Sequence, residues 1–291
     1  MQQFFCELRD GTMLECKSFG QSNPEDPTLI FLHEGIGCVD LWKNFPQQLS
    51  QATGLRSICY SRAGYGRSSS VSWPRPVTYM HNEALTVLPE VLEKLEIKDA
   101  ILFGHSDGAS ISLIHAGGCP GSSVRAMIIE APHVVIEELT LRSIADLSER
   151  YEHGDLRARL ERYHGDNVDC AFHGFVDTWL VPTYAASWSI LDFVAQVQIP
   201  TLVLQGADDQ FGTSRQLDLI KKTMPGVVDT VVIPDCGHHP HFESQQFVLD
   251  RSKRFVEEFL SQDYSRLRSQ RLRDGSSNEI NDSSSRSSPG V

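Results

Sequence analysis

Short, continuous apolar runs recur along most of the chain. They lie at residues 28–32, 56–60, 100–103, 126–129, 201–204 and 230–233. Because continuous apolarity fits strands that are covered on both faces, these runs predict a mostly parallel sheet. Two earlier runs, 4–8 and 13–19, flank Asp10-Gly11, which is a favoured hairpin turn. They predict an antiparallel hairpin at the edge of this sheet.

Longer segments with helical spacing separate the apolar runs. Leu85, Leu88, Leu92 and Leu95 recur three and four residues apart, which predicts a helix with one buried face. Strands that alternate with helices in this way are typical of repeated βαβ units. The pattern therefore predicts an α/β architecture.

The alternation stops between residues 135 and 198. Three helices are predicted there instead, the first ending at Gly154, the second at Gly165 and the third running from Val168 to Trp179. We therefore expect a core made of residues 1–134 and 199–262, with residues 135–198 packed over the sheet as a helical cap. Residues 263–291 become rich in serine and are predicted to form a disordered tail.

Charge and cysteine content narrow the classes of function. The 291 residues include 26 Lys+Arg and 38 Asp+Glu, a formal net charge of -12, which argues against nucleic acid or an anionic membrane as a partner.

The apolar runs are far shorter than the roughly 18 residues of a membrane-spanning helix, and Glu7, Arg9 and Asp10 lie where a signal peptide would be apolar. Seven scattered cysteines predict reduced thiols and a cytoplasmic protein. Nothing in the sequence indicates an oligomeric state.

The most specific motif follows the apolar run 100–103. It reads Gly104-His105-Ser106-Asp107-Gly108 and leads into a helical segment. Small residues two positions before and after the serine permit a sharp turn that holds Ser106 exposed in a strained conformation. A serine nucleophile also needs a base, and the base needs a third group to orient it.

Two loops downstream offer those groups. Asp208 and Asp209 follow the run 201–204, and a histidine-rich loop follows the run 230–233. Both loops belong at the carboxyl edge of a parallel sheet, where ligands bind. Spacing alone does not separate the two adjacent aspartates, so either one can be the orienting acid.

The histidine-rich loop contains His238, His239 and His241. A metal cluster is one interpretation of this spacing, but no carboxylate pair accompanies the three histidines. We favour a catalytic base and predict neither a metal nor a cofactor.

These motifs together resemble those of the α/β-hydrolase superfamily, and the resemblance extends over residues 1–262. It implies a mostly parallel, twisted eight-stranded sheet flanked by helices, with a cap after the sixth strand, where the 135–198 insertion falls. The matching positions are Gly104, Ser106 and Gly108 in the nucleophile elbow, Gly206 and Asp209 in the acid motif, and Gly237 and His238 in the terminal Gly-His pair.

The resemblance implies a role for each member of the triad. Ser106 is the nucleophile, His238 the base and Asp209 the orienting acid. Some members take the acid from the sixth strand, which leaves Glu130 as an alternative. A serine rather than an aspartate at the elbow argues against the haloalkane dehalogenase and epoxide hydrolase branches.

The loop after the third strand departs from the usual His-Gly beginning, because Glu34 stands between His33 and Gly35. The family pattern implies that the backbone N–H of Asp107 binds the oxyanion, and we predict Gly35 as the second donor, with Ile36 as the alternative. Glu34 is either a substrate contact or a structural hydrogen-bonding group of the loop.

The predicted function is a cofactor-independent serine hydrolase. Its substrate is a small or medium, largely apolar carbonyl compound, namely an ester, lactone or thioester, with amides and carbon–carbon bonds also open. The alternative is a catalytically idle ligand-binding or receptor protein on the same fold, suggested by the altered Glu34 loop. The predicted substrate contacts are Glu34, Ile36, His105, Trp179 and Trp188.

Overall fold

An eight-stranded sheet forms the centre of the molecule, in the order β1-β2-β4-β3-β5-β6-β7-β8. The computed structural model describes residues 1–278, with side chains through residue 261. β2 runs antiparallel to β1 and β4, and every other neighbouring pair is parallel, as predicted. The strands are β1 (Gln2–Glu7), β2 (Met13–Phe19), β3 (Thr28–Leu32), β4 (Ser57–Tyr60), β5 (Ala100–His105), β6 (Val124–Glu130), β7 (Thr201–Gly206) and β8 (Val228–Ile233).

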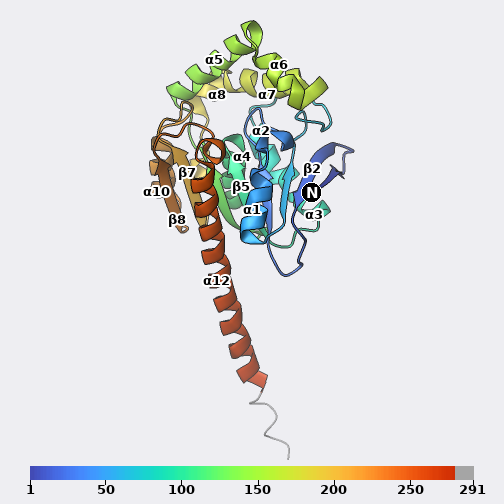
Figure 1. Ribbon diagram of the computed structural model, residues 1–291. Helices are drawn as coiled ribbons and strands as arrows, with labels where there is room; N and C mark the ends of the chain where they lie inside the picture. Colours follow the sequence, from blue (N-terminus) through green and yellow to red (C-terminus); the bar gives the residue numbers. More distant parts are fainter. Residues whose placement is uncertain (279–291) are drawn as a thin grey trace, which may run out of the picture.

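Helices connect the strands and cover both faces of the sheet (Figure 1). They are α1 (Phe45–Thr53), α2 (Tyr79–Asn82), α3 (Leu88–Lys94), α4 (Asp107–Gly118), α5 (Glu138–His153), α6 (Leu156–His164), α7 (Val168–Trp179), α8 (Pro182–Ser187), α9 (Leu191–Val194), α10 (Arg215–Thr223), α11 (Pro240–Glu243) and α12 (Gln245–Asn278). Three further turns are the 3₁₀ helices η1 (Val39–Trp42) and η3 (Gly165–Asn167) and the π-helical turn η2 (Glu83–Val87).

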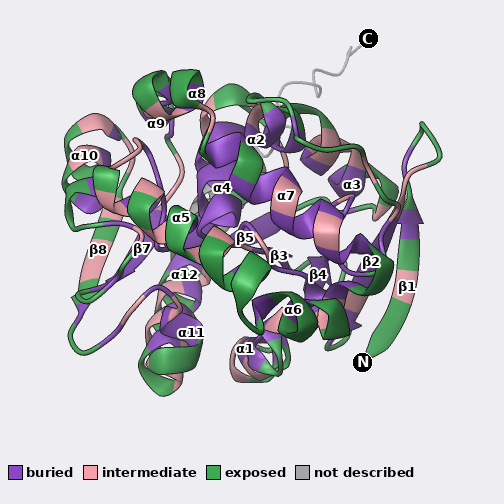
Figure 2. Ribbon diagram, turned by 90° about the horizontal axis from the view of Figure 1, so that it is seen from above, coloured by how far each residue is buried: buried purple, intermediate pink, exposed green. Residues whose placement is uncertain are grey.

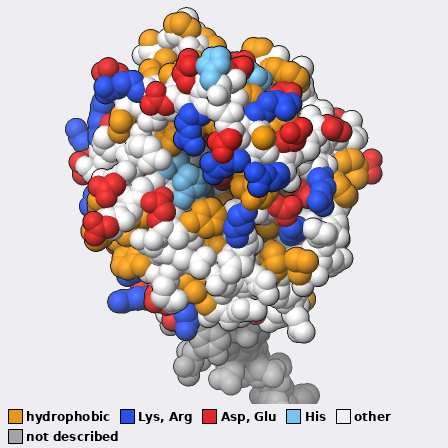
Figure 3. Space-filling model, turned by 45° about the horizontal axis from the view of Figure 1, so that its top comes forward, with side chains coloured by type: hydrophobic (Ala, Val, Ile, Leu, Met, Phe, Trp, Pro, Cys, Tyr) orange, Lys and Arg blue, Asp and Glu red, His pale blue; other side chains and the backbone are white. Residues whose placement is uncertain are grey.

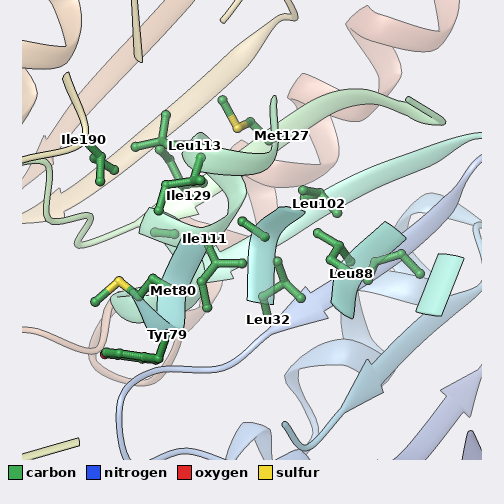
Figure 4. Packing of buried hydrophobic residues seen from close by; sticks show 14 of the residues in the cluster. Leu32, Tyr79, Met80, Leu88, Leu102, Ile111, Leu113, Met127, Ile129 and Ile190 are labelled. Carbon is green, nitrogen blue, oxygen red and sulfur yellow. The ribbon is translucent and has the colours of Figure 1, made fainter. Parts of the chain in front are cut away.

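Two apolar layers sandwich the sheet, because successive side chains of a strand point to opposite faces. On β3, Leu29 and Phe31 belong to the layer that includes Trp42 of η1. Ile30 and Leu32 belong to the layer on the other face. Figure 4 shows part of that second layer, where side chains of β3, β5 and β6 meet those of α4, namely Leu32, Leu102, Ile129, Ile111 and Leu113. Burial on both faces explains why the strands are continuously apolar in sequence.

One predicted helix face differs from the structure. Leu88 and Leu92 are buried, but Leu85 is 38% exposed. Leu85 lies in η2, whose π-type turn closes hydrogen bonds over five residues rather than four. The wider turn rotates Leu85 away from the face that Leu88 and Leu92 share.

The region between β6 and β7 contains the helices α5 to α9. An isolated bridge between Val135 and Ser189 joins the beginning of this insertion to a point near its end. In Figure 1, α5, α6 and α7 lie above the end of the sheet, and in Figure 2, seen from above, α5 and α6 present exposed outer faces while α4 is buried beneath them. The insertion thus covers one edge of the sheet. The exact boundaries 135 and 198 stay a prediction.

The C-terminal helix α12 continues to Asn278. The predicted tail of residues 263–291 therefore starts inside a helix, and its residues 279–291 lie outside the described residues. Within residues 1–278, no helix is both long and apolar enough to cross a membrane. All seven cysteines are free thiols.

Candidate active site

Ser106 lies at the sharp turn between the central strand β5 and α4. Its backbone is strained, with φ +52° and ψ -114°. Glycines are required around it because a Cβ on Gly104 would lie 2.5 Å from the carbonyl oxygen of Gly108, and a Cβ on Gly108 would lie 1.9 Å from that of Leu32. The sequence motif therefore reflects close approach of three backbone segments.

His238 bridges Ser106 and Asp209. Its Nε2 lies 3.0 Å from Ser106 Oγ, and its Nδ1 lies 2.9 Å from both carboxylate oxygens of Asp209. All three residues are less than a tenth exposed. In this arrangement the imidazole can accept the proton of the serine hydroxyl, while the carboxylate orients the imidazole.

Asp209 is fixed by the loop that follows β7. Its carboxylate accepts hydrogen bonds from the backbone N–H groups of Phe211 and Gly212, at 2.7 and 3.2 Å, and from the side-chain amide of Gln205, at 2.6 Å. Burial raises the pKa of Asp209, but the contact with His238 and these donors outweigh it and lower the pKa to about 2. Asp209 therefore stays ionised beside the imidazole.

The alternative acids lie elsewhere. Asp208 is exposed, and Glu130 pairs with His241 at 2.6 Å. Two of the histidines considered for the alternative metal cluster, His238 and His241, thus pair with carboxylates, Asp209 and Glu130. Within the described chain, no group of three or more His, Cys, Asp or Glu side chains is arranged to hold a metal ion.

Three backbone N–H groups near Ser106 are free to bind an anion. No hydrogen bond within residues 1–278 uses the N–H of Asp107, Gly35 or Ile36. The Gly35 position requires glycine, because a Cβ there would lie 2.3 Å from the ring of Phe175 in α7. Both predicted donors and the alternative Ile36 are therefore available.

Arg62 contacts both segments that carry the predicted oxyanion donors, the loop after β3 and the start of α4. This fully buried guanidinium donates to the carbonyl oxygens of His33 and Glu34, at 2.5 and 2.9 Å, and lies 3.8 Å from the carboxylate of Asp107. Burial raises the pKa of Asp107, and the positive charge of Arg62 opposes that increase. The hydroxyl of Tyr79 also donates to Asp107. Arg62 thereby fixes the loop before Gly35 relative to the helix that starts at Asp107.

Glu34, which is partly buried, forms an ion pair with the fully buried His105. The carboxylate lies 3.5 Å from Nδ1 of His105, and Nε2 of His105 lies 2.7 Å from the carbonyl oxygen of His238. Burial opposes both charges, but each partner stabilises the other, which lowers the pKa of Glu34 and raises that of His105. His105 thus connects Glu34, the extra residue of the loop, to the backbone of His238, the predicted base.

A cavity of 440 Å³ lies between Ser106 and the helical insertion. In Figure 3, which brings this side of the molecule forward, a hollow contains a histidine and hydrophobic side chains and is bordered in part by Lys and Arg side chains. Two arginines of the insertion, Arg150 and Arg159, lie on the wall. The apolar lining residues are Ile36, Leu41, Ile144, Leu147, Leu156, Leu160, Phe175, Trp179 and Phe211.

The predicted substrate contacts divide into two groups. Glu34, Ile36 and Trp179 line the cavity. His105 and Trp188 do not. His105 is fully buried by its pairing with Glu34 and the His238 loop, and Trp188 packs behind Trp179, with ring centroids 5.6 Å apart.

Sequence reasoning missed His133, which lines the cavity directly after β6. Its ring centroid lies 6.0 Å from that of His238 and 5.3 Å from that of Trp179. A lone histidine carries no motif. The signal that was available is its position after an apolar run, at the edge of the sheet where Ser106 and His238 also lie.

Comparisons with known proteins identify the family and the fold of the chain. A family model described as the Alpha/beta hydrolase family matches residues 29–251. The proline iminopeptidase of Lactobacillus helveticus (strain DPC 4571) is 20% identical over 221 residues, which are 64% of this chain and 75% of that protein.

Solved structures share the fold at low identity. An esterase from Thermogutta terrifontis, 17% identical, superposes with a TM-score of 0.67 over 89% of this chain and 99% of its own. A structure described under novel epoxide hydrolases from metagenomes of hot environments is 21% identical, with a TM-score of 0.66 over 89% and 98% of the two chains. The family match spans most of the described chain and includes all three residues of the Ser106 site, so the chain belongs to the α/β-hydrolase family.

Proposed function

We propose that the chain is a cofactor-independent serine hydrolase that uses Ser106, His238 and Asp209 as a catalytic triad. The observation that carries the proposal is the pair of contacts made by His238, 3.0 Å to Ser106 Oγ and 2.9 Å to Asp209. Serine alone is a weak nucleophile at neutral pH, and a neutral imidazole at hydrogen-bonding distance is the group that activates it.

The first half-reaction forms an acyl-enzyme. Nε2 of His238 takes the hydroxyl proton while Ser106 Oγ attacks the substrate carbonyl, and Asp209 stabilises the imidazolium that results. The backbone N–H groups of Asp107 and Gly35 hold the oxyanion. Collapse of the tetrahedral intermediate breaks the bond to the leaving group, which receives the proton from His238.

Water completes the cycle. It gives a proton to His238 and attacks the acyl carbon, and the second tetrahedral intermediate releases the acid and returns the proton to Ser106. Each proton removed in one step is returned in the next, so the reaction needs no cofactor.

The cavity supports a small or medium, largely apolar carbonyl substrate. Its 440 Å³ lies within the usual range of small-molecule sites, and aliphatic and aromatic side chains dominate its wall. We propose that residues 135–198 act as a cap over this substrate. The seven free thiols and the acidic charge support a cytoplasmic enzyme that acts on small molecules rather than on nucleic acid or membranes.

A ligand-binding protein without turnover is the second candidate function. The observation that favours it is the Glu34–His105 ion pair at 3.5 Å, an addition beside the oxyanion loop that a hydrolase of this fold does not need. A binder, in turn, has no need of the complete Ser106–His238–Asp209 arrangement.

Covalent labelling with a fluorophosphonate tests the hydrolase. Intact-mass analysis should find a single adduct on the native protein and none on Ser106→Ala. The matched control is Ser112→Ala, in the same helix, whose hydroxyl bonds the Gly108 carbonyl at 2.8 Å and should leave labelling intact. A native protein without an adduct would overturn the proposal, whereas an adduct without turnover of any ester, thioester or lactone would favour the binder.

A further inference from the structure

His133 is a buried polar side chain on the wall of the catalytic cavity. It is 2% exposed, and its main chain is held by Ser110, whose hydroxyl donates to the His133 carbonyl at 2.7 Å. The imidazole packs edge-on against Trp179. The ring is therefore fixed in place on the cavity wall.

Within the described chain, His133 is the one buried histidine whose ring nitrogens make no hydrogen bond. Each of the others has a partner for at least one nitrogen, as His115 has in the carbonyl of Ala84 at 2.8 Å and His164 in the N–H of Gly66 at 3.0 Å. His33, His105, His238 and His241 are likewise bonded. Nδ1 of His133 is fully buried without an acceptor or donor, so Nε2 is the ring nitrogen that a ligand in the cavity can reach.

An imidazole nitrogen that faces a cavity without a protein partner is free to pair with a ligand, and such a bond offsets part of the cost of burying the ring. We propose that His133 forms a hydrogen bond with an uncharged oxygen of the substrate, and that the preferred substrates carry such an oxygen, a hydroxyl, ketone or amide, close to the scissile carbonyl. This proposal rests on the proposed hydrolase function, because it places the group in the same cavity as Ser106.

The electrostatics of the site favour an uncharged partner. Burial lowers the pKa of His133 to about 4, and the nearby His238 reinforces the decrease. The imidazole is therefore neutral at pH 7 and offers one donor and one acceptor. A substrate carboxylate beside His133 would lose its hydration, and the neutral imidazole would offer no positive charge to compensate.

Two esters of equal acyl length test the inference. 4-Nitrophenyl pentanoate and 4-nitrophenyl 4-oxopentanoate differ by one ketone oxygen, and the readout is the ratio of their kcat/KM values. His133→Phe should lower the oxo-to-plain ratio about three- to tenfold, the usual effect of one uncharged hydrogen bond. His133→Gln, which retains hydrogen-bonding groups, should restore part of the ratio. An unchanged ratio in His133→Phe would overturn the inference.

A packing control separates hydrogen bonding from a change of shape. Leu147→Met alters the cavity wall without a hydrogen-bonding group, and it should move the two kcat/KM values together. A fall of the ratio in this variant as large as that in His133→Phe would contradict the proposed hydrogen bond.

A binding measurement keeps the inference independent of turnover. In a Ser106→Ala background, both esters are titrated while the fluorescence of the tryptophans, which include Trp179 in the cavity, is followed. Tighter binding of the oxo ester that is lost in Ser106→Ala/His133→Phe would support the role of His133 even if the native protein hydrolysed neither ester. Equal binding of the two esters, or no binding of either, would overturn it.

Discussion

Asp209 shows how a single residue in the site depends on its surroundings. Asp208 and Asp209 are adjacent in sequence, but only Asp209 is buried. Its carboxylate contacts His238, Gln205 and two backbone N–H groups. Spacing does not reveal which of two neighbouring aspartates turns inward, because that depends on the path of the loop. The family motif Gly-x-x-Asp was the information that selected Asp209.

The lowered pKa of Asp209 predicts an acid-dependent loss of stability. An aspartate ordinarily titrates near 3.9, and in the folded protein the pKa is lowered to about 2. Because the folded state holds the ionised form, this stabilisation, about 2–3 kcal/mol, is present above pH 4 and is lost as the pH falls toward 2. The Asp209→Asn variant lacks the ionisable carboxyl group and therefore lacks this pH-dependent stabilisation. Urea unfolding at pH 5 and at pH 2.5 should find a smaller difference between native protein and variant at the lower pH.

The same substitution separates stability from activity. The amide introduced by Asp209→Asn would no longer fix the tautomer of His238, so kcat should fall by about 10⁴ at neutral pH. Asp208→Asn is the matched control, since that side chain is exposed, and it should change neither property. A pH-independent stability difference for Asp209→Asn would contradict the assigned role of the His238 contact and of the hydrogen-bond donors.

At the scale of elements, α7 and the loop after β3 approach each other closely. Gly35 and Phe175 touch so closely that a Cβ on Gly35 would lie 2.3 Å from the ring. Gly35→Ala should therefore displace Phe175 and cost about 1–3 kcal/mol of unfolding free energy. The displacement should also disturb the predicted oxyanion donor, so kcat should fall while the fluorophosphonate still reaches Ser106.

A double-mutant cycle checks this contact. Phe175→Leu removes the ring edge that the new methyl group would meet, so Gly35→Ala/Phe175→Leu should be less destabilised than the sum of the two single variants. Unfolding free energies from urea titrations of the four proteins give the coupling. Strict additivity would mean that the new methyl group is accommodated in some other way.

The elements themselves were largely predictable from the sequence. All six predicted parallel-sheet runs coincide with strands to within two residues. Burial on both faces explains the continuous apolarity of the inner strands, whereas β8, at the edge of the sheet, is only partly buried. The π-type turn at Leu85 was not predictable, because leucines spaced three and four residues apart look alike whether or not the helix widens. Nor did the sequence reveal that His105 pairs with Glu34, since these residues are 71 positions apart and meet only when β3 and β5 pair.

At the scale of the molecule, side chains at several points attach the helical insertion to the core. At the α7 end, Nε1 of Trp179 donates to the hydroxyl of Tyr79 at 3.0 Å. At the α5 end, the hydroxyl of Thr140 donates to the carbonyl of Phe211, in the loop that carries Asp209. Another attachment is at η3, where the buried amide of Asn167 donates to the carbonyls of Gly66 and Ser68, at 3.1 and 2.7 Å. Polar contacts at several points thus add to the apolar packing that holds the insertion over the cavity.

Loss of one attachment should loosen the insertion locally. Asn167→Ala leaves two buried carbonyl groups without their donor, which should cost about 1–3 kcal/mol. Amide hydrogen exchange should quicken in α6 and η3, because local opening follows the loss of local contacts, while β5 and β7 keep their protection. Asn23→Ala is the matched control, since its side-chain amide bonds only Glu25 and Asp26 in an exposed loop. Exchange that quickened equally in the central strands would mean that the insertion and the sheet open as one unit, and that the cavity is uncovered only when the whole fold opens.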